Sequence, residues 1–162
     1  MHTELLIFDL DGTLVDSSTD ISNALNHAIE PFGIEPVSVP ETITLIGEGL
    51  TRLIGKLIEK RHASVELPVL LDRFLEHYSA HLADCTRPYP GTREVLDALS
   101  PCRKAIISNK TELLSVRLLD ALNLGNTSTM SQEATPPGKR SLLPSPFLTS
   151  LVTSTFCLKR LF

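Results

Sequence analysis

The chain has 162 residues, enough for one ordinary domain or a small core with an insertion, and 42% hydrophobic residues support a buried core. Its formal net charge of −4 and the absence of a basic stripe argue against nucleic acid as a primary partner. Three scattered cysteines (Cys85, Cys102 and Cys157) give no disulfide framework or zinc spacing, and no charged leader or membrane-length apolar run begins the sequence. We therefore expect a reduced, cytoplasmic protein without a membrane segment.

The first predicted element is a short apolar run over residues 4–8, which ends in two carboxylates, Asp9 and Asp11. Its unbroken apolar character predicts a strand buried on both faces, and open α/β sheets bind ligands at the carboxyl ends of strands. Residues i and i+2 of an extended chain point to one side, so these carboxylates repel unless a divalent cation lies between them or one holds a proton. Asp9 could then supply a nucleophilic oxygen and Asp11 a proton. Gly12 allows a sharp turn that Thr13 can cap.

Four amphipathic helices are predicted next, with no strand pattern between residues 16 and 83. Capping side chains at residues 16–18 precede the first helix, and Gly33 ends it. Pro40 begins the second helix, which the segment Gly47-Glu48-Gly49 breaks. The apolar positions are, helix by helix, Ile21, Leu25, Ile29 and Phe32; Ile43 and Ile46; Leu50, Leu53, Ile54, Leu57 and Ile58; and Val69, Leu70, Phe74, Leu75, Tyr78 and Leu82.

An α/β pattern returns after residues 87–91, a stiff linker with two prolines and a glycine. A short helix with Val95, Leu96 and Leu99 precedes a second buried-strand run, residues 104–107. A last amphipathic helix follows, with apolar positions Leu113, Leu114, Val116, Leu118, Leu119 and Leu122, closed by Leu124-Gly125. This alternation predicts an α/β core with a parallel sheet and a helical bundle inserted after the first strand.

A second polar cluster, Ser108-Asn109-Lys110, follows the second strand and precedes a helix. Ser108 can hydrogen-bond a phosphoryl oxygen, and backbone amides at the start of the following helix add partial positive charge. Taken alone, Ser-Asn-Lys is more simply an ordinary helix cap, and Asp-x-Asp is more simply a strand followed by a polar turn. Together the two clusters favour a phosphate site.

Residues 8–17, Phe-Asp-Leu-Asp-Gly-Thr-Leu-Val-Asp-Ser, resemble the first motif of the haloacid dehalogenase-like phosphohydrolases, and their end resembles the phosphoglycolate phosphatase branch. Ser108 resembles the family's second motif, and Asn109-Lys110 matches this branch's continuation. The resemblance implies a Rossmann-like core, here incomplete, formed by residues 1–15 and 84–125, with a helical cap formed by residues 16–83. It also places Gly47, Glu48 and Gly49 where the cap offers a loop to the substrate, although a plain turn between helices explains them equally well.

The resemblance implies Mg²⁺ as the cofactor and a small phosphorylated metabolite, such as 2-phosphoglycolate, as the partner. Asp9 would attack phosphorus and, with the backbone carbonyl of Asp11, hold the metal. The Asp11 carboxyl would protonate the leaving group and then activate water. Gly12, Thr13, Ser108 and Asn109 would bind the phosphate.

Residues 126–162 depart from the family pattern. All but one of the 19 carboxylates lie before this tail, which holds Glu133 alone. The expected lysine, the later metal-binding acids and the further strands have no counterpart, although Lys139 would serve if the tail folded back. With synonymous codons, another reading frame from Gly125 onward would give Lys-Tyr-Phe-Asp-Asp and then Gly-Gly-Asp-Thr, as the family has there. We interpret the tail as a frame slip or truncation, against a natural or disordered end, and the nucleotide sequence tests this.

Two alternative functions remain open. The chain is either an active phosphotransfer enzyme, as a hydrolase or a phosphomutase, or an inactive truncated homologue that acts as a binding module. We expect weak or no turnover and poor solubility, because missing strands would leave an exposed sheet edge. His77 and His81, four residues apart on a helix, could share a metal but lack a third ligand at useful spacing, so a solvated face is the better interpretation. The sequence sets no oligomeric state.

Overall fold

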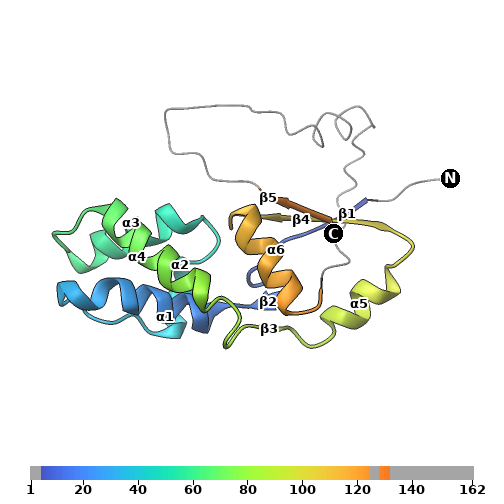
Figure 1. Cartoon of the computed structure of the whole chain (residues 1–162), viewed down its shortest axis with the longest axis horizontal. Helices are drawn as coiled ribbons and strands as arrows, with labels where there is room; N and C mark the ends of the chain where they lie inside the picture. Colours follow the sequence, from blue (N-terminus) through green and yellow to red (C-terminus); the bar gives the residue numbers. More distant parts are fainter. Residues whose placement is uncertain (1–4, 125–127, 132–162) are drawn as a thin grey trace, which may run out of the picture.

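The computed structural model describes residues 5–124 and 128–131, which form a parallel sheet beside a bundle of helices (Figure 1). The strands β1 (Leu5–Phe8), β4 (Arg103–Ser108) and β5 (Ser128–Ser131) lie in the order β1-β4-β5, and both pairings are parallel. The register pairs Leu5 with Arg103 and Phe8 with Ile106. The carboxyl ends of β1 and β4 therefore meet at one edge, and the predicted α/β fold with a parallel sheet is confirmed.

Four helices follow β1, and two more flank β4. A pair of two-residue strands, β2 and β3, joins the two groups through antiparallel pairing of Val15 with Pro88. The bounds are β2 (Val15–Asp16), α1 (Ser18–Ile29), a 3₁₀ turn (Glu30–Phe32), α2 (Val39–Leu45), α3 (Leu50–Arg61), α4 (Leu67–Ala80), β3 (Arg87–Pro88), α5 (Thr92–Ala98) and α6 (Glu112–Ala121). In Figure 1 the helices α1–α4 gather on the left, and the sheet lies on the right with α5 and α6. None of the helices in the described part of the chain has the length and apolarity needed to cross a bilayer.

The helical bundle is held by apolar side chains at helical spacing, as predicted. Helix α4 packs against both α1 and α3, and the apolar residues of these helices that are at most 1% exposed are Ala24, Leu25, Ala28, Ile29, Ile54, Leu57 and Leu70. Fully burying a side chain of leucine or isoleucine contributes about 1.5–3 kcal/mol, so these contacts dominate the stability of the bundle.

Helix α2 turns a different face to the core than the sequence predicts. Ile43 is 56% exposed, whereas Thr42 and Leu45 are buried. The helix spans two turns and begins at Ser38, whose hydroxyl accepts a hydrogen bond from the Glu41 amide. Thr42 can be buried because its hydroxyl donates to the Ser38 carbonyl oxygen at 3.0 Å, which satisfies its polar group inside the helix. Other predicted core positions that lie exposed are Phe32, Val69, Val95, Leu113 and Val116.

Strand β1 is not buried on both faces, so this prediction is wrong. Leu5 and Ile7 are 38% and 47% exposed, and Ile107 of β4 is 38% exposed. The paired register places these three side chains on one face of the sheet, and the described elements leave that face open. The opposite face carries Leu6, Phe8 and Ile106, which are partly or fully buried.

The exposed face of the sheet should promote self-association, because contiguous apolar surface favours contact with another chain. We expect Ile7→Lys to raise the monomeric fraction in size-exclusion chromatography at a given protein concentration. Asn23→Lys adds the same charge to an exposed position of α1 and is the matched control. Equal behaviour of both variants and the parent chain would contradict the expectation.

The strand β5 corrects the expectation that no strand follows the last helix. It pairs with β4 from Ala105 to Ser108, opposite Ser128 to Ser131. Backbone hydrogen bonds form the ladder, so a short strand needs no apolar run in its own sequence. The remaining parts of the tail, including Glu133, Lys139 and Cys157, lie outside the described residues.

A buried carboxylate joins the start of the helical bundle to the segment that leaves it. Asp20 on α1 is 3% exposed, and its oxygens accept hydrogen bonds from the amides of Cys85 and Thr86 at 2.8–3.0 Å. The Thr86 hydroxyl donates a further bond at 2.7 Å. We call these three residues the Asp20 clamp. Hydrogen bonds to a charged acceptor are stronger than neutral ones, so the clamp fixes where the chain enters and leaves the bundle.

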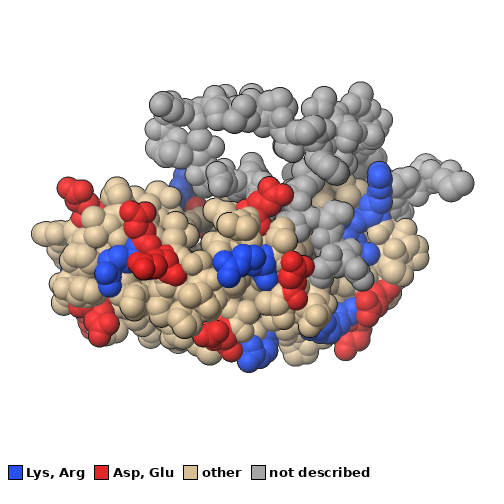
Figure 2. Space-filling view, viewed as in Figure 1, with Lys and Arg blue, Asp and Glu red and all other residues tan. Residues whose placement is uncertain are grey.

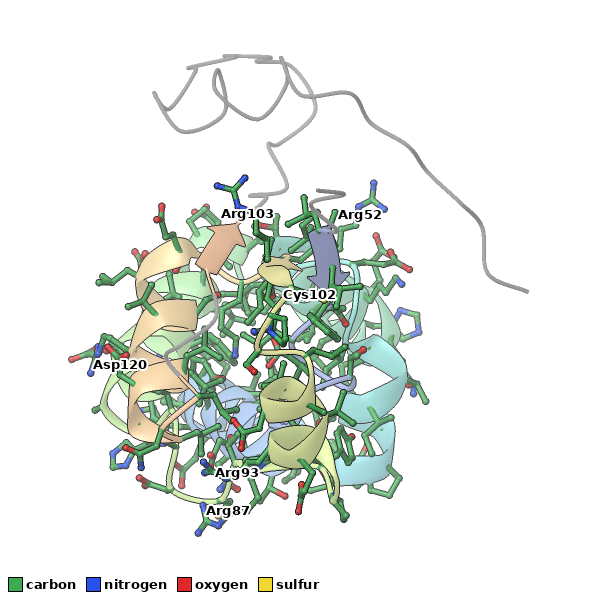
Figure 3. All side chains as sticks on the ribbon, turned by 90° about the vertical axis from the view of Figure 1, so that its right-hand side faces the viewer. Arg52, Arg87, Arg93, Cys102, Arg103 and Asp120 are labelled. Carbon is green, nitrogen blue, oxygen red and sulfur yellow. The ribbon has the colours of Figure 1, made fainter. Side chains whose placement is uncertain are left out.

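A second set of hydrogen bonds connects the two helices that accompany the sheet, α5 and α6. Arg93 of α5, labelled in Figure 3, donates to the carbonyl oxygens of Leu122 and Asn123 at the end of α6. Positive charge at the C-terminus of a helix is favourable, and these carbonyls have no partner within the helix. Arg93 therefore holds α5 against α6 below the sheet.

Candidate active site

A pocket of about 220 Å³ lies where the carboxyl ends of β1 and β4 face α3 and α4. Both predicted motifs open into it, because parallel strands bring their carboxyl ends to one edge. The lining residues are Asp9, Asp11, Ile21, Ile46, Gly47, Gly49, Leu50, Leu53, Phe74, Leu75, Tyr78, Ser108, Asn109, Lys110, Thr111 and Leu114.

The turn after β1 places the two aspartates. The carbonyl oxygen of Leu10, which is fully buried, accepts hydrogen bonds from the amides of Thr13, Leu14 and Val15 at 3.0–3.3 Å. This tight turn requires a positive φ of 85° at Gly12, a conformation that glycine adopts without steric cost. The turn predicted at Gly12 is therefore present, and it returns the chain into β2.

Asp9 and Asp11 have different surroundings. Asp9 is exposed, and its Oδ2 accepts one bond, from the Thr13 hydroxyl at 3.1 Å. Asp11 is partly buried, and its Oδ1 accepts from the Ser17 hydroxyl at 2.6 Å and pairs with Lys110 Nζ at 3.0 Å. Asp9 thus lines the pocket with one hydrogen bond to its carboxylate, whereas Asp11 is held in place from two sides.

Three hydroxyls bond to carboxylates where the sequence predicts capping side chains. Ser17, the N-cap residue before α1, makes no side-chain cap bond, because its hydroxyl donates to Asp11 instead. The Asp16 carboxylate accepts from the Ser18 amide and hydroxyl, at 3.1 and 2.6 Å. Thr13 likewise bonds Asp9 through its hydroxyl and joins the turn through its backbone.

The second motif reaches the same pocket from β4. Ser108 is 4% exposed, and its Oγ accepts a hydrogen bond from the Lys110 amide at 3.1 Å. Asn109 extends to the helical bundle, where its Nδ2 donates to the Gly47 carbonyl oxygen at 2.6 Å. Phosphate binding by Ser108 and Asn109 stays a prediction. The side-chain amide of Asn109 also connects the sheet to the helical bundle.

Lys110 is the functional side chain that the sequence reasoning missed. Its side chain is 7% exposed, its Nζ donates to the Tyr78 hydroxyl at 2.5 Å, and it lies 4.7 Å from the centroid of the Tyr78 ring. Burial by itself lowers the pKa of Lys110, but the Asp11 carboxylate and the Tyr78 oxygen outweigh burial and raise that pKa. Lys110 therefore stays protonated and delivers a full positive charge beside Asp11.

Tyr78 sits on α4 and is 2% exposed. Burial raises the pKa of its hydroxyl, so the group remains neutral and accepts from Lys110. Tyr78 is an apolar position of a predicted helix, and Lys110 follows a predicted strand. Neither local pattern indicates that the two side chains are in contact.

In the loop of residues 47–49, which is predicted to face the substrate, the two glycines line the pocket and Glu48 does not. Gly47 and Gly49 line the pocket with φ values of 115° and 89°. The Glu48 carboxylate instead pairs with Lys56 at 2.7 Å and Arg52 at 3.4 Å on α3, and Glu48 does not line the pocket. Hydrogen bonding to Lys56 lowers the pKa of Glu48, so this residue stays anionic.

His77 and His81 form a stack of rings with His27. The ring centroids are 4.2 Å apart for His27 and His77 and 4.5 Å apart for His77 and His81, and His81 Nδ1 lies 2.8 Å from Asp84 Oδ2. Among the residues with a described structure, no group of three or more histidine, cysteine, aspartate or glutamate side chains is arranged to hold a metal. The stack instead joins α1 to α4.

The carboxylate oxygens that line the pocket are of the chemical type that Mg²⁺ prefers as ligands. Mg²⁺ binds hard oxygen ligands, often one or two carboxylates completed by water and substrate phosphate. Asp9 has a single hydroxyl partner, and Asp11 lines the same pocket. On the face shown in Figure 2, acidic and basic side chains are interspersed.

The fold and the carboxylates at the strand end define a Rossmann-like α/β protein with an inserted helical bundle. The family model described as haloacid dehalogenase-like hydrolase matches residues 6–130, and the chain belongs to this family. The match extends past Gly125, where the sequence resemblance was expected to end, to within β5.

Relatives within the family are phosphatases by name. The chain is 42% identical over 125 residues to a phosphoglycolate phosphatase of Agrobacterium fabrum, covering 74% of this chain and 54% of that protein. It is 36% identical over 152 residues to a phosphoglycolate phosphatase of Chromobacterium violaceum, covering 88% and 68%. The chain thus spans about half the length of the first of these relatives.

Solved structures share the fold. The crystal structure of a predicted phosphoglycolate phosphatase from Haemophilus somnus superposes with a TM-score of 0.73 at 24% identity, over 83% of this chain and 64% of that one. A haloacid dehalogenase-like family protein from Streptococcus pneumoniae gives 0.70 at 19% identity, over 83% and 64%.

Proposed function

We propose that this site carries out phosphomonoester hydrolysis through an aspartyl phosphate on Asp9. The observation that supports this most directly is the exposed Asp9 carboxylate, which shares one pocket with Asp11, Ser108 and Lys110 at the ends of two parallel strands. A nucleophile, a proton carrier, a hydroxyl donor and a cation are the groups that phosphoryl transfer needs within reach of each other.

The reaction has two steps. An Asp9 oxygen attacks phosphorus while the bond from phosphorus to the ester oxygen breaks, and Asp11 gives its proton to the departing alkoxide. Water then attacks the phosphorus of the aspartyl phosphate, Asp11 takes the proton from that water, and inorganic phosphate leaves with Asp9 restored. When bound at the Asp9 carboxylate and the backbone carbonyl oxygen of Asp11, Mg²⁺ would offset the repulsion between carboxylate and phosphate.

The other pocket residues bind and orient the phosphoryl group. The Ser108 hydroxyl and the backbone amides near Gly12 donate hydrogen bonds to its oxygens, together with Thr13 and Asn109. Lys110 supplies the positive charge that we expected from a lysine in the tail, because it is the described pocket residue that carries one.

We further propose that residues 16–83 act as a cap over the core formed by residues 1–15 and 84–125. The Asp20 clamp and the bonds from Asn109 and Lys110 to the bundle hold the pocket together, so the cap excludes water while the phosphoryl group moves. The names of the relatives support 2-phosphoglycolate, a small phosphorylated metabolite, as a candidate substrate.

Trapping with beryllofluoride in the presence of Mg²⁺ tests the proposal. An active phosphotransfer site should bind the aspartyl-phosphate mimic, detected by ¹⁹F NMR, and an inactive binding module should not. Release of phosphate into water, rather than onto a second sugar, separates a hydrolase from a phosphomutase. Slow turnover of the isolated chain with clear trapping would support the proposal, and absence of trapping would contradict it.

We expect Lys110→Met to weaken beryllofluoride binding and to lower any phosphatase rate by about 10²–10³-fold, the usual effect of removing one charge-stabilising group. Lys110→Arg keeps the charge and should retain part of the binding. Lys104→Met removes a lysine that bonds the carbonyl oxygens of Leu99 and Cys102 outside the pocket, and it serves as the control. Unchanged trapping in Lys110→Met would show that Lys110 serves the fold alone.

A further inference from the structure

The wall of the pocket changes in chemistry from one end to the other. The core supplies the polar end, with Asp9, Asp11, Ser108 and Lys110. The helices supply an apolar wall with the side chains of Ile21, Ile46, Leu50, Leu53, Phe74, Leu75 and Leu114. A substrate with its phosphoryl group at Asp9 therefore directs its leaving group toward hydrocarbon.

Polar groups on the helical side of the pocket already have partners. The Gly47 carbonyl oxygen accepts from Asn109, and the Tyr78 hydroxyl accepts from Lys110. The start of α3, at Gly49 and Leu50, adds the partial positive charge of a helix N-terminus, about half an elementary charge. This falls short of the full countercharge that a buried carboxylate needs.

The cations of the helical bundle are engaged elsewhere. Glu48 binds Arg52 and Lys56, and Glu41 binds Lys60 and Arg61. Arg73 donates to the carbonyl oxygens of Ala28 and His27. None of these basic residues is among those that line the pocket. Among the described residues that line the pocket, the cation available to a second anionic group of the substrate is Lys110, which is already paired with Asp11.

The size of the pocket points the same way. The pocket has a volume of about 220 Å³. On the same measure one water molecule needs on the order of 10–15 Å³, so the pocket is many times larger than a single water molecule. A phosphoryl group on a two-carbon acid leaves much of this apolar wall uncovered. A longer hydrocarbon leaving group fills it and removes both wall and substrate from water.

We propose that the pocket selects phosphate monoesters of apolar alcohols, alkyl or aromatic, over phosphorylated acids such as 2-phosphoglycolate. The inference rests on the proposed function, because it takes the phosphoryl group to lie at Asp9. It differs from what the names of the relatives support, and it follows from side chains of this chain's own helices.

Two phosphonates of equal shape test the choice. In 3-methylbutylphosphonate an isopropyl group stands where 3-phosphonopropanoate has its carboxylate, and the latter has the shape of 2-phosphoglycolate. We expect isothermal titration of the full chain with Mg²⁺ to give a dissociation constant at least about tenfold lower for 3-methylbutylphosphonate, the effect of burying methyl groups rather than a charge. Equal or reversed affinities would overturn the inference.

A charge placed in the apolar wall supplies the matched variant. Leu50 is partly exposed at the first turn of α3, so Leu50→Lys should fold, and it should shift the preference toward 3-phosphonopropanoate by about tenfold or more. Ile43→Lys adds the same charge on the exposed side of α2, outside the pocket, and should leave the ratio unchanged. A ratio that Leu50→Lys does not move would overturn the inference.

Beryllofluoride binding distinguishes failure of the proposed phosphotransfer function from failure of the inferred substrate selectivity. If beryllofluoride binds with Mg²⁺ but the phosphonates show no preference for the alkyl group, the phosphotransfer site stands and the inferred selectivity falls. If neither beryllofluoride nor either phosphonate binds, the proposed function falls, and the selectivity falls with it.

Discussion

Asp9→Asn is expected to abolish beryllofluoride trapping and to lower phosphate release by at least about 10³-fold, the scale of loss when a nucleophile is removed. Asparagine has nearly the same shape and can still accept the hydrogen bond from the Thr13 hydroxyl. Its amide oxygen, however, carries no charge to attack phosphorus or to bind Mg²⁺. The change therefore tests the chemistry of the site without removing a contact that holds the turn.

The control for this experiment lies far along the chain. Asp120→Asn makes the same substitution at an exposed position of α6, labelled in Figure 3, and should keep the parent's trapping. ¹⁹F NMR of bound beryllofluoride and a phosphate-release assay give the two readouts. Trapping that persists in Asp9→Asn would remove Asp9 as the nucleophile, and the phosphatase proposal with it.

Asp20→Ala should lower the free energy of unfolding by about 3–5 kcal/mol, because each buried donor left without its acceptor costs about 1–3 kcal/mol. The substitution leaves the amides of Cys85 and Thr86 and the Thr86 hydroxyl without an acceptor, inside a region where Thr86 is fully buried. Since ordinary domains are stable by about 5–15 kcal/mol, a large part of the fold's margin depends on this clamp.

Urea unfolding followed by circular dichroism measures this loss. Asp20→Asn keeps one carbonyl acceptor and should cost less, about 1–3 kcal/mol. Asp72→Ala removes a carboxylate from the exposed face of α4 and should change stability by less than about 0.5 kcal/mol. If Asp20→Ala unfolds at the same urea concentration as Asp72→Ala, the clamp does not hold the bundle to the core.

The elements that the sequence predicted well are those with a strong local pattern. Helix α3 shows this, because Leu53, Ile54 and Leu57 recur at helical spacing and are all buried. The faces of short or edge elements were harder to predict. Ile43 of α2 and Ile7 of β1 look like core residues by composition, yet they lie exposed, because which elements cover them depends on tertiary packing rather than on local pattern.

The residues of the candidate site also differ in whether a local sequence pattern predicts them. Asp9, Asp11 and Ser108 follow directly from strands that end in polar residues, and the structure brings all three to one pocket. The Lys110 ammonium reaches that pocket by pairing with Asp11 and Tyr78, which are far away in the sequence. Asp20 binds Cys85 and Thr86 over a similar span. Hydrophobic periodicity carries no information on contacts between residues so far apart in the sequence. These contacts could therefore be identified only in the structure.

The order of the sheet has a consequence for synthesis on the ribosome. Strand β1 is synthesised before its partner β4, so Leu5 stays unpaired until Arg103 has been made. Contacts between nearby segments form sooner than contacts between distant ones, so α1, α3 and α4 can assemble while β1 is still unpaired. During that interval the nascent chain exposes the apolar strand β1, and a chaperone that binds this strand would protect it from aggregation.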